Sequence, residues 1–104
     1  MGNLALVNAL NRDALRAGLD SYFADAGYSP RMKDAMVEAT LEALKREFES
    51  LLPDGCTWAW NTTTITGSHG LSDDEIISLM ISAQMAVAHQ LPEIEDRVRA
   101  ECGE

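Results

Sequence analysis

The sequence predicts a single, mainly helical α+β domain: three to four helices around one core, with a short β-hairpin or bulged strand between the second and third helices. Two patterns predict it. Apolar residues recur at helical spacing in three long segments, and one segment of alternating and β-branched residues separates the last two. A chain of 104 residues, 46% hydrophobic and 24% charged, is typical of one globular domain over residues 1–104.

The first helix is predicted over residues 4–26. Leu15, Leu19 and Phe23 recur at intervals of four residues, with charged side chains on the opposite side. Polar residues and a glycine weaken the N-terminal part of this pattern, so a helix that breaks near Asn11 is the alternative.

The second helix is predicted to begin at Pro30, capped by Ser29, and to end before the turn at residues 53–55. Proline is tolerated at a first helical position because its missing N–H would have no partner there. Apolar residues keep helical spacing along the whole segment, and three of them are predicted to anchor the core: Leu41, Leu44 and Phe48.

A strand segment is predicted over residues 56–66. Trp58 and Trp60 alternate with smaller residues, and β-branched residues follow them. The alternation slips near Asn61, which leaves two alternatives, a hairpin of two short strands or one bulged strand, ending at the glycine-containing turn 67–70.

The third helix is predicted to begin with a capping box, in which Ser72 and Glu75 satisfy each other's backbone amides. Apolar residues cover almost the whole circumference of residues 76–91, so this helix is predicted to be buried nearly all round. Pro92 disfavours helical geometry in the preceding residue. A short fourth helix, or a kinked continuation, is predicted to run to about Cys102.

Charge is distributed unevenly along the chain. There are 8 Lys and Arg against 17 Asp and Glu, a net charge of −9. Residues 47–96 contain nine acids and no Lys or Arg, while the rest of the chain is neutral. Helix start signals account for about half of this asymmetry, and the remainder is a field that attracts a basic partner. Direct binding of nucleic acid is not expected from an acidic chain.

No motif predicts catalysis, a cofactor or a metal, so we expect a protein that is not an enzyme. Cys56, His69, His89 and Cys102 lack the close spacing of metal ligands, and the cysteines are predicted to be free thiols. Ser68 beside His69 is not in the context of a catalytic serine. No secretory signal or segment long enough to span a bilayer is found, so we expect a cytoplasmic protein.

The candidate partner-binding residues are acids of the Lys- and Arg-free half, together with its two tryptophans. Acidic side chains supply the field, and indoles supply amphipathic contact area, although the tryptophans fit the core as well. The predicted residues are Glu47, Glu49, Asp54, Trp58, Trp60, Asp73, Asp74 and Glu75.

Two hypotheses for function follow. The first is a non-enzymatic inhibitor whose acidic half docks on the basic surface of a nucleic-acid-handling complex. Phage inhibitors of host defence, anti-CRISPR proteins included, share this size and charge. The analogy is with this class of protein, and it rests on no matched residue or motif. The alternative is a homo-oligomeric structural or assembly module of bacterial or phage origin. A homodimer is predicted because two other long helices are too few to cover residues 76–91 on all sides.

Overall fold

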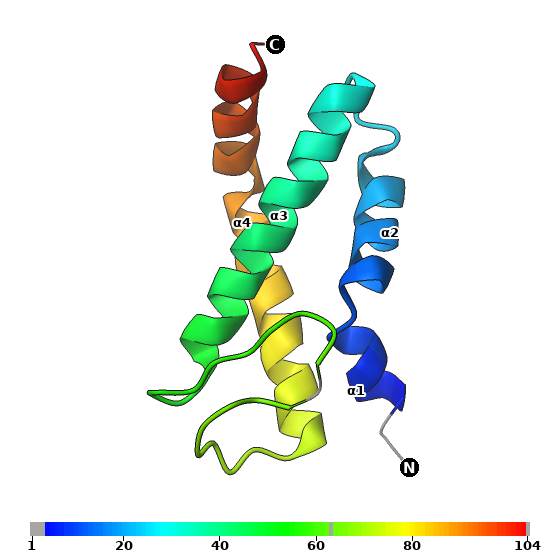
Figure 1. Cartoon of the computed structure of the whole chain (residues 1–104). Helices are drawn as coiled ribbons and strands as arrows, with labels where there is room; N and C mark the ends of the chain where they lie inside the picture. The colour runs from blue at the N-terminus through cyan, green and yellow to red at the C-terminus, as the bar shows by residue number, and fades with distance from the viewer. Residues whose placement is uncertain (1–3, 63, 104) are drawn as a thin grey trace.

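Four α-helices follow one another in the computed structural model, which describes residues 4–62 and 64–103. They are α1 (Leu4–Ala9), α2 (Arg12–Phe23), α3 (Pro30–Leu51) and α4 (Asp73–Cys102). α2, α3 and α4 run alternately up and down, and a long loop, residues 52–72, crosses one end of the bundle between α3 and α4 (Figure 1). The prediction of a mainly helical fold is confirmed.

The helices begin where local side chains cap them. The Ser29 hydroxyl accepts the Met32 amide at 3.1 Å. The Ser72 hydroxyl accepts the Glu75 amide at 3.2 Å, and the Glu75 carboxylate accepts the Ser72 amide in return, so the predicted capping box is present. The prediction of one helix over residues 4–26 is wrong: the structure has two helices, α1 and α2, and α2 ends at Phe23. The alternative, a break near Asn11, is the one found, because the Asn11 side-chain oxygen caps α2 by accepting the Ala14 amide at 2.9 Å.

The core is built around α3, which packs against both α2 and α4. Phe48 is fully buried, and Leu41 and Leu44 are 1% and 4% exposed, so all three predicted anchors of this helix lie in the core. α4 supplies a matching stripe of buried residues at helical spacing: Ile76, Met80, Ala83, Val87, Ile94 and Val98. Burial of these two facing stripes holds the domain together.

α4 continues through Pro92 as one helix of 30 residues, so the kinked continuation is the alternative that the structure supports, and the helix bends along its length (Figure 1). The prediction that residues 76–91 are buried nearly all round is wrong for the single chain. Ile81 is 51% and Met85 62% exposed, because α3 and α1 cover only part of this helix. None of the helices described here has both the length and the apolar character that a membrane span requires.

The predicted β-hairpin or bulged strand is not found in the described residues. Among the residues that the structure describes, only Thr57 and Thr66 pair, as an isolated antiparallel bridge with backbone hydrogen bonds of 2.9 and 2.8 Å. The pairing ends because Trp58 turns into the core, where its ring lies 4.9 Å from that of Phe48. Thr63, part of the predicted segment, lies outside the described residues.

Asn61 explains why the chain leaves the extended conformation after this bridge. Its φ of 64° is left-handed, which an asparagine tolerates better than most residues and which a strand excludes. Its amide donates to the Leu10 carbonyl at 3.1 Å, and its side-chain oxygen accepts the Arg12 amide at 2.8 Å. The loop thus uses these polar groups to fasten the junction of α1 and α2.

Candidate functional site

The predicted acidic residues lie on α3, on the loop that follows it and at the start of α4. Glu47 and Glu49 lie in the last turns of α3, Asp54 follows that helix, and residues 73–75 begin α4. The C-terminal end of α3 and the N-terminal end of α4 lie at the same end of the molecule (Figure 1). Asp54 and residues 73–75 lie toward this end, whereas Glu47 bonds to Gln90, which is about 25 Å along α4 from Asp73 at 1.5 Å per residue.

Three of the six acids are engaged within the chain. Glu47 accepts the Gln90 amide group at 2.7 Å, Glu49 pairs with Lys45 at 2.6 Å, and Glu75 belongs to the capping box. Asp54, Asp73 and Asp74 are exposed, and no cation in the described part of the chain lies within ion-pair distance of them. These three carboxylates are the available part of the predicted site.

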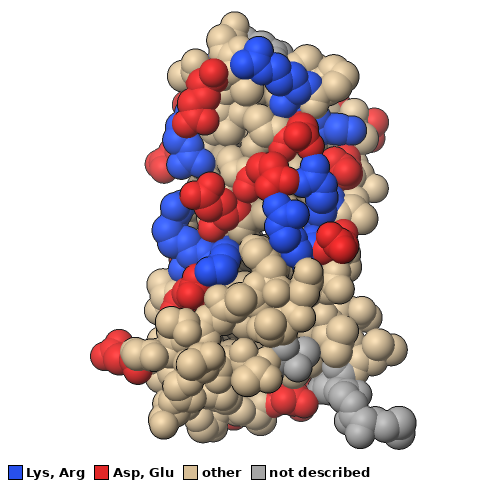
Figure 2. Space-filling model, viewed as in Figure 1, with Lys and Arg blue, Asp and Glu red and all other residues tan. Residues whose placement is uncertain are grey.

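Most of the basic side chains form ion pairs with acids of the same chain. Among the described residues, five of the eight Lys and Arg side chains form ion pairs, namely Arg12, Arg16, Lys45, Arg97 and Arg99. Figure 2 shows blue and red atoms interleaved over one half of the visible face and few charges over the other half. Positive charge is therefore matched locally, whereas negative charge is left in excess.

Arg16 illustrates this internal pairing. It bridges α2 to Asp34 and Glu38 of α3, and Arg12 pairs with Glu38 as well. The hydrogen bond to Glu38 raises the pKa of the Arg16 guanidinium above its ordinary value. Exposed pairs of this kind contribute little to stability, but they remove these cations from any role in attracting a nucleic acid.

The two tryptophans have different surroundings. Trp58 is 4% exposed, and its indole N–H donates to the Thr62 carbonyl at 2.9 Å, so the structure places it in the core. Trp60 is partly buried, with its ring centroid 4.7 Å from that of Trp58 in an edge-to-face arrangement. Of the two indoles, Trp60 is the one with accessible surface for a partner.

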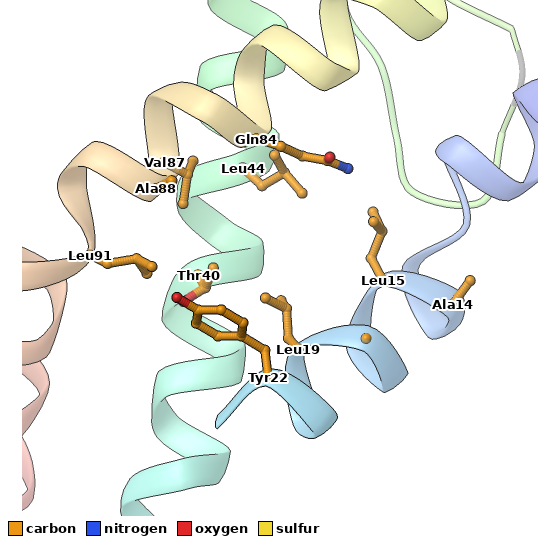
Figure 3. A pocket seen from close by; sticks show the side chains of 11 residues that line it. Ala14, Leu15, Leu19, Tyr22, Thr40, Leu44, Gln84, Val87, Ala88 and Leu91 are labelled. Carbon is orange, nitrogen blue, oxygen red and sulfur yellow. The ribbon is translucent and has the colours of Figure 1, made fainter. Parts of the chain in front are cut away.

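An apolar groove lies between α2 and α4, with α3 as its floor. α2 and α4 both pack against α3 but, within the described residues, not against each other. The groove has a volume of about 320 Å³. Figure 3 shows side chains of all three helices projecting into it, among them Leu15, Leu19, Tyr22, Leu44, Val87 and Leu91.

The groove continues into a second hollow of about 380 Å³, which shares Tyr22 and Leu91 with the first. Two carboxylates line this second hollow, Asp25 and Glu95, and Glu95 is paired with Arg99. The Glu95 carboxylate accepts the Tyr28 hydroxyl at 2.9 Å. We call the two hollows together the α2–α4 groove.

Glu95 is held in its charged form. Hydrogen bonds from Arg99, at 2.9 and 3.1 Å, and then from Tyr28 lower the pKa of the Glu95 carboxyl below its ordinary value. Burial and the neighbouring Glu95 raise the pKa of Tyr28. Glu95 is therefore ionised at neutral pH and paired with Arg99, so the exposed Asp25 is the carboxylate of this hollow that no cation of the described residues pairs with.

No family model, curated protein or solved structure significantly matches this chain. Its function is therefore inferred from geometry and charge.

The sequence does not predict the α2–α4 groove. Gly18, which lines it, is the glycine that weakens the helical pattern of residues 4–26, and the apolar circumference of residues 76–91 predicts burial. The signal that could have found the groove is the pairing of small residues Ala14 and Gly18 on one face of α2 with an α4 too apolar for its neighbours to cover.

The other reactive side chains considered in the sequence do not converge. His69 accepts the Leu71 amide on Nδ1 at 3.0 Å, and Cys56 and Cys102 are free thiols. In residues 4–62 and 64–103 no group of three or more His, Cys, Asp and Glu side chains is arranged to hold a metal ion.

Proposed function

We propose that this protein is a non-enzymatic interaction module that binds a basic protein partner through its surplus of carboxylates. The observation that carries the proposal is the unequal use of charge. Five of the eight basic side chains pair within the chain, whereas Asp54, Asp73 and Asp74 are exposed and unmatched in the described residues. A partner with a basic surface supplies the missing cations.

Binding of this kind has a direct inhibitory consequence. Unmatched surface charges attract a basic partner over long range and raise the association rate more than the affinity. A basic surface that handles nucleic acid needs its cations for phosphate contacts. An acidic module docked there occupies that surface, which is the action we propose for this protein by analogy of class with phage inhibitors of host defence.

Capture from a bacterial lysate tests the proposal. The immobilised wild-type chain is compared with a double variant, Asp73→Lys with Asp74→Lys, and the retained proteins are identified by mass spectrometry. A second double variant, Asp13→Lys with Asp20→Lys, makes the same change of net charge outside the acidic half.

We expect basic proteins to be retained by the wild type and by the Asp13/Asp20 variant, and to be lost from the Asp73/Asp74 variant. Retention of the same proteins by all three chains would show that these carboxylates do not select the partner.

A homo-oligomeric module is the second candidate, favoured by Ile81 and Met85, which are 51% and 62% exposed on α4. Sedimentation at low and high salt separates the two functions, because apolar self-association persists in salt that screens a contact between charges. A monomer of 11.4 kDa in both conditions favours the interaction module. A dimer that persists in high salt favours the assembly module.

A further inference from the structure

We propose that the α2–α4 groove is the docking site for an amphipathic helix of the partner that carries Lys or Arg near one end. This inference rests on the proposed function, since it names the element of the basic partner that binds and the place where it binds. The occupant is a helix of the partner and not a second copy of this chain, because of the shape and the charge of the groove.

The shape of the groove fits one helix. α2 and α4 flank α3, so a helix laid on α3 between them would complete a four-helix arrangement. The wall from Ala14 to Tyr22 is about 12 Å long at 1.5 Å per residue, enough for about two helical turns. Helices bound in such grooves insert apolar side chains at i, i+3 or i+4, and i+7.

The molecule is elongated along its longest helix. It measures 44 × 27 × 18 Å, with a radius of gyration of 14.7 Å, and the 30 residues of α4 span about 45 Å at 1.5 Å per residue. α1 contacts α4 near the start of α2, and the other end of the groove opens toward Asp25 and Glu95.

Small residues line the walls and allow a helix to approach closely. Ala14 and Gly18 of α2 and Ala88 of α4 are exposed at the groove. A Cβ atom placed on Gly18 would have no heavy atom within 4 Å, so the space beside it is empty. Pro92 has no N–H to donate to the Ala88 carbonyl, which leaves that carbonyl without its usual helical partner.

The exposed apolar surface of α4 extends this site. Ile81, Met85 and Ala88 lie at i, i+4 and i+7, so they share one side of the helix. Ile81 and Met85 are more than half exposed. α4 carries no charged residue from Ile76 to Pro92, and the wall that it offers to a partner's apolar face is therefore continuous.

Charge selects the occupant. Asp25 is exposed at one end of the groove, and no cation of the described residues pairs with it, whereas Glu95 is paired with Arg99. Among the described residues, no Lys or Arg lines either hollow. A helix with an apolar face and a basic end satisfies both features. A second copy would bring its own net charge of −9 to a chain of the same net charge, and like charges repel.

Two synthetic helical peptides of about 14 residues test this site on the full chain. Both have leucine at i, i+3, i+4 and i+7; one has lysine at the remaining positions and the other glutamate. Fluorescence anisotropy measures their binding to the wild type and to Gly18→Leu, which fills the empty space in the groove. Ala17→Leu adds the same side chain on a part of α2 that does not line the groove.

We expect the lysine peptide to bind the wild type at least about tenfold more tightly than the glutamate peptide does, a difference of about 1.4 kcal/mol or more. Gly18→Leu should weaken the lysine peptide by about tenfold or more, and Ala17→Leu should leave it unchanged. Asp25→Asn should weaken it several-fold, whereas Asp96→Asn, the same change away from both hollows, should not.

Unchanged binding of the lysine peptide to Gly18→Leu, with the variant folded by circular dichroism, would overturn the proposal. So would a wild-type dimer that Gly18→Leu dissociates, because the groove would then hold a second copy. In either case the proposed interaction module is still supported if the Asp73/Asp74 variant loses the captured partner. The interaction module is contradicted as well if that variant retains every protein that the wild type retains.

Discussion

Replacement of Phe48 by alanine tests how the long loop is held without strands. Phe48 is fully buried in α3, and its ring meets that of Trp58 edge to face, with centroids 4.9 Å apart. Trp58 in turn contacts Trp60, with ring centroids 4.7 Å apart. Phe48→Ala removes the ring against which Trp58 packs in this cluster of Phe48, Trp58 and Trp60. It should therefore destabilise the loop and the core together.

The expected cost is large for a domain of this size. Phe→Ala in a core lowers the free energy of unfolding by about 3 to 5 kcal/mol, as lost transfer energy and the energy of the cavity that remains. The upper half of that range applies here, because an edge-to-face pair adds about 0.5 to 1.5 kcal/mol. A domain of about 100 residues has about 5 to 15 kcal/mol in total.

Urea denaturation, followed by tryptophan fluorescence and circular dichroism, measures this cost. Leu51→Ala is the matched control, since Leu51 lies on the same helix but is 41% exposed, and it should cost less than about 1 kcal/mol. A loss below about 1 kcal/mol for Phe48→Ala would refute the aromatic cluster as the support of the loop.

Further variants probe the groove and the core. Gly18→Ala should raise the free energy of unfolding by about 0.5 to 1 kcal/mol, since the glycine lies within a helix and its Cβ position is empty; thermal denaturation checks this. Leu44→Ala should lower it by about 2 to 4 kcal/mol in urea, because Leu44 is 4% exposed at the groove floor. Glu95→Gln should lower the melting temperature at neutral pH. The folded pKa of Glu95 is depressed, so its stabilisation is present above the ordinary carboxyl pKa and lost as pH falls through the folded value. Melting curves of both proteins should therefore converge in acid, and a constant difference would contradict this.

The starts of α3 and α4 could be predicted because local chemistry determines them. Ser29 and the Ser72–Glu75 box each use side chains within three residues of the amides they cap. The division of residues 4–26 into two helices was only the alternative, because Asn11 caps α2 at a point where the apolar spacing continues. The buried face of α3 was predictable for a similar reason, since its apolar spacing matches the helical period along the whole segment.

The loop and the groove could not be predicted, because both depend on contacts between distant segments. β-branched residues after Trp60 favour a strand locally, yet Trp58 gains more by packing on Phe48, and Asn61 bonds the α1–α2 junction. The apolar surface of α4 predicts that something covers it. Only the positions of α2 and α3 reveal that one side remains open.

The salt dependence of association tests the central claim most directly. The rate constant for binding of the captured partner is measured over a series of salt concentrations for the wild type and for Asp73→Lys with Asp74→Lys, with thermal melts showing that both are folded. We expect a rate that falls steeply with salt for the wild type, and a slower rate with a flatter dependence for the variant. Equal rates and equal salt slopes for two folded proteins would contradict the claim, because Asp73 and Asp74 would then serve only helix capping and solubility.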